Sequence, residues 1–342
     1  MPIPFLLAGA AVFAGVLGAG GHLSASETNE KAQLRAKRAE LLYNTQKNEL
    51  EQEQSRTEQL LLKLGYEKKN VLNSSMREFV KVFDKIKHIK VTESIGLDEI
   101  EKFAIDQQGV LEIRKMSDIY STTLESGATG AAAGAIIALA ASGSLSVVTS
   151  GLATAGSVLM LGDIGMAAGI AGSALSFGAA MTPLAAVAAP VILFTGISAS
   201  MKADENLEKA DAMYAQAEAA VEKMKNSEII CKAIGDKADM FYDLLMKLDE
   251  LFSECVIHLV EVVQKKENES DFKEKLTDDE IKLIAVTRSL AGAVKAVIDT
   301  PMLSKNGSVS DEAKQMYAKT KKALPDFERD VAKVNATRIN FF

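Results

Sequence analysis

The sequence lacks tryptophan altogether and has only three histidines and two cysteines among its 342 residues. Without tryptophan, the chain has no interfacial belt of the kind that anchors permanent membrane proteins. The cysteines, Cys231 and Cys255, form no C-x-x-C pair or Cys/His ligand cluster, so we expect no zinc site. On one continuous helix they would lie roughly 36 Å apart. We therefore expect two buried free thiols.

Motifs for catalysis are missing as well. The chain contains no G-x-x-x-x-G-K-[ST] loop, no G-x-S-x-G elbow and no H-E-x-x-H helix. Its net charge of -7 and its pI of about 5.3 argue against nucleic-acid binding through a basic surface. We interpret the chain as a non-enzyme with no cofactor, no metal, no nucleic-acid partner and no small-molecule substrate.

Charge is nearly absent from residues 126–201, where Asp163 is the one ionisable side chain. Glu125 and Lys202 stand directly outside this uncharged stretch. Core helices of globular proteins carry a polar face as well as an apolar one. An uncharged stretch of this length is more typical of membrane-inserting sequence. Breaks divide it into short segments, but two crossings near 128–148 and 180–200 approach the ~20 residues that a bilayer requires.

Small residues recur at every fourth position within the uncharged stretch. Such rows line one helix face and let two backbones approach closely. We expect five glycines to pack against neighbouring helices there, namely Gly130, Gly134, Gly165, Gly169 and Gly172.

Asp163 lies in the turn-like sequence Gly162-Asp163-Ile164-Gly165. A solvated loop tip is the simpler interpretation. The functional one is control of insertion by pH, because an ionised carboxylate at the bilayer centre costs at least ~2.5–3.5 kcal/mol. Protonation would remove that cost.

Residues 1–26 form a second apolar segment, with no lysine or arginine before its hydrophobic run. We favour a retained membrane-active or hairpin-packing segment over a cleaved signal peptide. The chain then divides into this segment, a first helical half at 27–125, the membrane-active stretch at 126–201 and a second helical half at 202–342.

Both halves show helical periodicity. In the first, we expect a polar helix from Glu27, solvated over residues 44–59 and ended by Gly65, and a third helix over 97–124 with Leu111 on its apolar face. Between them, residues 67–90 carry a 4-3 seam. Its members are Leu72, Met76, Phe79, Phe83 and Ile86. The lysines that end this helix are either a solvated basic face or a contact for anionic headgroups.

The second half begins with a heptad pattern over 202–262, either one helix or two joined near Asn226-Ser227. We place one column of that seam at Leu207 and Tyr214, and we expect His258 to be a bundle histidine. Thr277 and Glu280 match a capping box. A helix then runs to Pro301, and Ser310 caps a short helix that ends before Pro325, with a last helix from Asp326. The predicted fold is all-α: an elongated bundle with coiled-coil-like helices and a central Gly/Ala-rich hydrophobic helical hairpin.

Long helices, a central uncharged stretch and long helices again resemble the α-helical pore-forming toxins of the cytolysin A and haemolysin BL or non-haemolytic enterotoxin type. The Gly/Ala character of 127–200 is also similar to the membrane segment of apolipoprotein L proteins, and to an uncharacterised bacterial family automatically labelled a chemotaxis protein. The toxin resemblance implies a bundle whose hydrophobic segment leaves it to enter a membrane.

We expect a membrane-permeabilising protein that is membrane-associated and has a soluble form, cytoplasmic or secreted. Its expected partners are a lipid bilayer and, on insertion, further copies or partner subunits. One alternative is a membrane-anchored coiled-coil scaffold or receptor-like adaptor without pore activity. Another is a soluble subunit that hides the stretch against a partner.

Overall fold

The computed structural model describes residues 23–86, 103–125, 136–141, 203–266, 276–304 and 307–339. This part of the chain is 93% helical and has no strands, which confirms the all-α prediction. Its named helices are α1 (Leu23–Asn73), α2 (Ser75–Ile86), α3 (Gln107–Glu125), α8 (Ala203–Lys266), α9 (Asp278–Asp299) and α10 (Asp311–Ile339). Residues 1–22 and almost all of the predicted central hairpin lie outside the described residues.

The chain forms two compact units. The first contains residues 1–46 and 189–222, and the second contains residues 47–188 and 223–342. Helices α1 and α8 contribute to both units, whereas α2, α3, α9 and α10 belong to the second.

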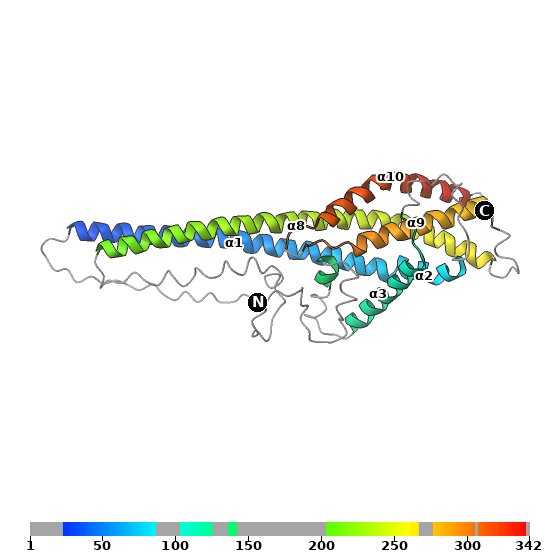
Figure 1. Ribbon diagram of the computed structural model, residues 1–342, viewed down its shortest axis with the longest axis horizontal. Coiled ribbons are helices and arrows are strands. Elements are labelled where there is room, and N and C mark those ends of the chain that lie inside the picture. Colours follow the sequence, from blue (N-terminus) through cyan, green and yellow to red (C-terminus); the bar gives the residue numbers. More distant parts are fainter. Residues whose placement is uncertain are drawn as a thin grey trace. The chain divides into compact units, whose positions relative to one another are not determined.

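Within each unit, α1 and α8 lie side by side and run in the same direction (Figure 1). In the first unit, Asn206 Nδ2 donates to Asn29 Oδ1 at 2.9 Å. In the second, Arg56 pairs with Asp236 and Lys63 with Asp239, each at 3.0 Å. The separation in sequence between partners stays between 176 and 180 residues. A nearly constant separation of this kind is typical of an in-register parallel pair.

Helix α8 is one uninterrupted helix of 64 residues, so the alternative with a joint near Asn226-Ser227 is wrong. Sixteen of its buried positions form an unbroken 4-3 alternation, the spacing of a coiled-coil seam. Those positions are Asn206, Ala210, Met213, Ala217, Ala220, Met224, Ser227, Cys231, Ile234, Ala238, Phe241, Leu245, Leu248, Phe252, Cys255 and Leu259. The predicted column through Leu207 and Tyr214 is displaced by one residue, and both side chains are only half-buried.

Helix α1 corrects two expectations. Its buried positions continue through the polar region, because Gln46 and Thr57 are 5% and 0% exposed. Thr57 Oγ1 donates to the Cys231 carbonyl of α8 at 2.9 Å, which satisfies a hydroxyl that is cut off from water. The helix also passes straight through Gly65 and ends at Asn73. Glycine lowers helix propensity but does not forbid a helix, and tertiary packing overrides that preference here.

The five predicted seam residues are all at most 3% exposed, but they do not share one helix. The predicted helix over 67–90 is divided at Ser74, so that Leu72 lies on α1 and the other four lie on α2. Phe79 packs edge-on against Phe252 of α8, with ring centroids 5.6 Å apart. The third helix begins later than predicted, at Gln107, because Asp106 caps it: Asp106 Oδ1 accepts from the Gly109 amide at 2.8 Å. Leu111 points outward and is 48% exposed, so the predicted apolar face of this helix is wrong there.

Helix α9 has the predicted capping box at Thr277 and Glu280, and it ends before Pro301 as expected. Ser310 caps α10 by accepting from the Ala313 amide at 2.9 Å. However, α10 does not stop at Pro325 but runs on to Ile339. An interior proline costs about 3 kcal/mol. The burial of Phe327 against Phe103, with ring centroids 5.8 Å apart, helps to offset that cost.

Candidate functional site

The only described part of the uncharged stretch is a short helix at 136–141, which we call the docked segment. It belongs to the second unit. Ile136, Leu139 and Ala140 are each 0% exposed. This piece of the uncharged stretch is therefore buried against the charged helices that flank it in sequence.

Gly65 of α1 permits this burial. A β-carbon built on Gly65 would lie 2.2 Å from the Ile136 carbonyl oxygen and 2.7 Å from its Cγ2 atom. Real β-carbons do not approach other atoms so closely, so any larger side chain at this position would push the docked segment away. The glycine that looked like a helix break is thus the point where two backbones meet.

Lys68, one turn further along α1, binds the carboxyl end of the docked segment. Its Nζ donates to the Ile298 carbonyl of α9 at 3.0 Å and to the Leu139 carbonyl at 3.2 Å, with the Ala140 carbonyl at 3.5 Å. The Leu303 amide donates to the Ala141 carbonyl at 3.0 Å. The last carbonyls of a helix have no partners within the helix, and here Lys68 and Leu303 donate hydrogen bonds to them.

Lys68 is also among the largest fully buried side chains of the described residues, with 0% exposure. Burial lowers its pKa from an ordinary value of 10.5 to about 7, against the opposing field of Asp299. A lysine in such a position is neutral for part of the physiological pH range. Removing a charge from water without a paired counter-ion is costly, so the group gives up its proton instead.

A second lysine of this region, Lys295 of α9, keeps its charge. Its Nζ lies 2.8 Å from Glu112 of α3 and also contacts Asp299. Burial pulls the pKa of Lys295 down, but the two carboxylates outweigh burial and the net shift is upward. The hydrogen bond from Lys295 lowers the pKa of Glu112. The Asp299 carboxylate therefore pairs with Lys295, and its negative charge also raises the pKa of Lys68.

The residues before α3 cross α9 at another glycine. A β-carbon on Gly292 would lie 1.5 Å from the Phe103 carbonyl oxygen. Ile105 is held next to this crossing by Arg288 in both directions: its amide donates to the Arg288 carbonyl at 3.2 Å, and its carbonyl accepts from Arg288 Nη2 at 3.3 Å. These contacts fix α3 against α9.

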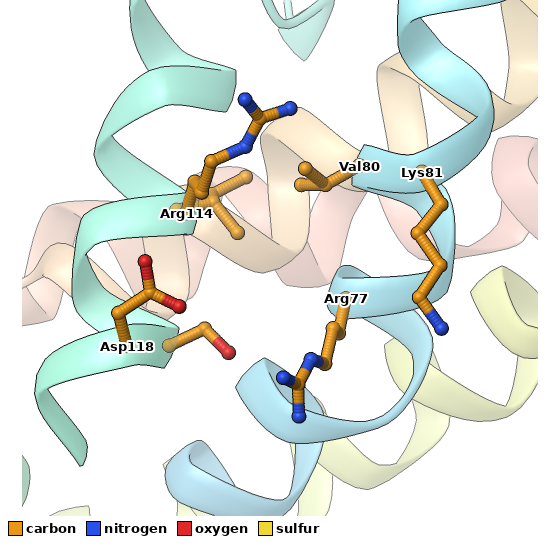
Figure 2. A pocket seen from close by; sticks show the side chains of 7 residues that line it. Arg77, Val80, Lys81, Arg114 and Asp118 are labelled. Carbon is orange, nitrogen blue, oxygen red and sulfur yellow. The ribbon is translucent and has the colours of Figure 1, made fainter. Parts of the chain in front are cut away.

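A groove of about 260 Å³ lies between α2 and α3. Figure 2 shows Arg77, Val80 and Lys81 on the α2 side and Arg114 and Asp118 on the α3 side. Although the groove collects three cations, Lys81 pairs with Glu78 at 2.5 Å and Arg114 with Asp84 at 3.2 Å. Because two of its three cations are paired with acids and Asp118 also lines it, the groove does not define an anion site.

The other residues that the sequence singled out have mixed outcomes. Gly130, Gly134, Asp163, Gly165, Gly169 and Gly172 all lie outside the described residues. Cys231 and Cys255 are buried free thiols as expected, and burial raises the pKa of Cys231 to about 11 and of Cys255 to about 12. His258 is buried in the bundle, where burial lowers its pKa.

Sequence reasoning missed Lys68, although a signal was present. Leu61, Leu64, Lys68 and Val71 follow the 4-3 alternation of α1, which puts a charged residue at a core position. Such a residue is almost never fully buried unless it has partners. A lysine at a core position therefore predicts a group of acceptors brought to it by another part of the chain.

Within the described ranges, no cluster of histidine, cysteine, aspartate or glutamate is suited to hold a metal ion. In the same part of the chain, no helix has the length and apolar character that crossing a membrane requires. Comparisons with protein-family models, with curated proteins and with solved structures found no match.

Proposed function

We propose that the protein inserts into membranes and permeabilises them through the uncharged stretch at 126–201. In this proposal the charged helices form a water-compatible scaffold, and the stretch exchanges its contacts with that scaffold for contacts with lipid. The protein acts as a pore-forming or membrane-permeabilising component and performs no enzymatic reaction.

The observation that carries the proposal is the docked segment. Five of its six uncharged residues, from near the start of the stretch, are buried against α1 and the end of α9 instead of facing water. A scaffold that shelters apolar sequence in this way is what a water-soluble form of an inserting protein requires.

Energetics supply the driving force. Each large apolar side chain that moves out of water contributes roughly 1.5–3 kcal/mol. The stretch 126–201 carries many leucine, isoleucine, valine and methionine side chains and one charge. Lipid is therefore a favourable environment for most of it. The partners of the protein in this state are the bilayer and further copies of the chain or other subunits.

The parallel α1–α8 pair favours a second candidate function. A parallel pair of long, in-register helices is the usual form of a coiled-coil scaffold. In this alternative the uncharged stretch anchors the chain in a membrane, and the helices bind other proteins without opening a pore.

Release of a self-quenched dye from liposomes distinguishes these functions. The protein, purified without detergent, is mixed with liposomes, and fluorescence is followed in time. We expect wild type to release dye, and we expect Gly65→Ala to release it several-fold faster because the new methyl group displaces the docked segment. Gly235→Ala is the matched control, since its new β-carbon would have no neighbour closer than 3.2 Å.

Three outcomes carry different conclusions. Faster release by Gly65→Ala alone supports the proposal. Binding to liposomes without release of dye from any variant supports the anchored scaffold. No binding and no release would refute both functions.

A further inference from the structure

The contacts of Lys68 join two segments that are distant in sequence. Its nitrogen is 3.2 Å from the Leu139 carbonyl of the docked segment and 3.0 Å from the Ile298 carbonyl of α9. A neutral amine has two N–H donors, which match these two nearer carbonyls, while the Ala140 carbonyl is more distant at 3.5 Å. The side chain is fully buried, and its hydrogen bonds go to backbone carbonyls and not to a carboxylate.

We propose that Lys68 is a proton-operated latch on the docked segment. The buried amine closes the contact between residues 136–141, α1 and α9. Opening of the segment exposes the amine to water, where it takes up a proton. Protonation therefore favours the open form, and loss of the proton favours the docked form.

The direction follows from linkage between protonation and opening. The pKa of Lys68 is about 7 when docked and returns to an ordinary 10.5 when exposed. Below pH 7 both forms carry the proton, so opening does not depend on pH. Between pH 7 and pH 10 only the open form carries it, so each rise in pH stabilises the docked form. From pH 7 to pH 9 the opening constant should fall roughly 50-fold.

Among the described residues, few charged groups on the neighbouring elements lie near Lys68. The docked segment has none. Helix α9 presents Asp299 and Lys295, with Glu112 of α3 beside them. Burial raises the pKa values of Asp249 on α8 and Glu67 on α1, but both carboxyls start from ordinary acidic values.

Three further buried groups have pKa values that are shifted away from this range. Burial lowers the pKa of His258 below its ordinary 6.5 and raises those of the two cysteines to about 11 and about 12. A pH range of 7–9 therefore favours detection of Lys68 over these other groups.

Hydrogen exchange followed by mass spectrometry tests the latch in the full chain without lipid. Protection factors, which correct for the chemical effect of pH on exchange, are measured at pH 7 and pH 9 for a peptide that contains 136–141. We expect protection in wild type to rise roughly 50-fold. Lys68→Met keeps an unbranched side chain of similar size without a titrating group, so its protection should be equal at the two pH values.

A second variant covers the case in which Lys68→Met fails to fold. Asp299→Asn removes the charge that raises the Lys68 pKa, so the change in protection should extend to lower pH. Equal protection of wild type at pH 7 and pH 9, or an unchanged pH dependence in Lys68→Met, would overturn the latch.

The latch would regulate the proposed membrane insertion, and in that use it rests on the proposed function. The two claims fail separately, because the exchange experiment contains no membrane and dye release does not require Lys68. Protection of the docked segment that depends on pH, without dye release, would retain the latch and refute the pore. Dye release combined with protection that does not depend on pH would retain the pore and refute the latch.

Discussion

The two units use the same α1–α8 pairing but fill its seam with different side chains. In the first unit the buried positions are mostly small or polar. They include Ala32, Ala39, Asn206, Ala210, Ala217 and Ala220. In the second unit the seam buries larger aromatic or branched side chains, among them Leu61, Leu64, Phe241, Leu245 and Phe252.

This difference predicts that the two units differ in stability although they share one heptad pattern. Hydrophobic stabilisation scales with the apolar area removed from water, and alanine contributes little of it. The first unit also buries the amide of Asn206, a type of residue that fixes register at a cost in stability. We therefore expect the first unit to open more readily than the second.

The largest expected effect comes from emptying the aromatic core. Phe252→Ala should destabilise the second unit by about 4 kcal/mol, because it removes a fully buried ring. Met213→Ala in the first unit should cost about 2 kcal/mol, the low end for such changes. Hydrogen-exchange protection of peptides from each unit checks both values. A larger loss in the methionine variant would contradict the comparison between the units.

A smaller effect is expected from the backbone crossing at Gly292. Gly292→Ala should destabilise the second unit by about 3 kcal/mol, because the new methyl group would overlap the Phe103 carbonyl and separate α3 from α9. Gly235→Ala, again the control, should leave stability within about 1 kcal/mol of wild type. Urea unfolding followed by circular dichroism measures both. Equal free energies of unfolding for the two variants would contradict the close contact between Gly292 and the Phe103 carbonyl.

The smallest expected effect is on the rate of membrane insertion, and it concerns Asp163 in the uncharged stretch. Asp163→Asn should speed membrane insertion at neutral pH and flatten its dependence on pH, because it removes a charge that costs at least ~2.5–3.5 kcal/mol in a bilayer. Dye release between pH 5 and pH 7.5 for wild type and variant measures this. Identical profiles would mean that Asp163 is a turn residue only.

Much of the fold could be predicted because the signals are local. The capping box at Thr277, the stop before Pro301 and the cap at Ser310 depend on residues within one turn of the helix end. The helical periodicity of α8 is equally local. The choice between two adjacent columns of α8 is not local, because it depends on which column faces α1. The prediction therefore placed Leu207 and Tyr214 on the seam, whereas Asn206 and Met213 lie there.

The candidate site could not be predicted because it depends on contacts between distant segments. Gly65 looked like a helix break until the Ile136 carbonyl was found beside it. Lys68 was not predicted at all, because the carbonyls of residues 139 and 298 that surround its nitrogen come from distant segments. Pro325 likewise remains within a helix because of the packing around Phe327. Tertiary contacts overrode a local preference in each case.

The most direct test of the central claim is whether the docked segment enters lipid. Ile137→Cys places a thiol on the docked segment, and Ile229→Cys places one on an exposed position of α8 as the control. The native thiols are buried and have raised pKa values, so a polarity-sensitive fluorophore should label the new cysteine selectively.

Liposomes that carry quenchers on their acyl chains are then added to each labelled protein. The account predicts that the label at position 137 shifts to shorter wavelength and is quenched, while the label at position 229 is unaffected. A label at position 137 that keeps its emission in the presence of lipid would contradict it.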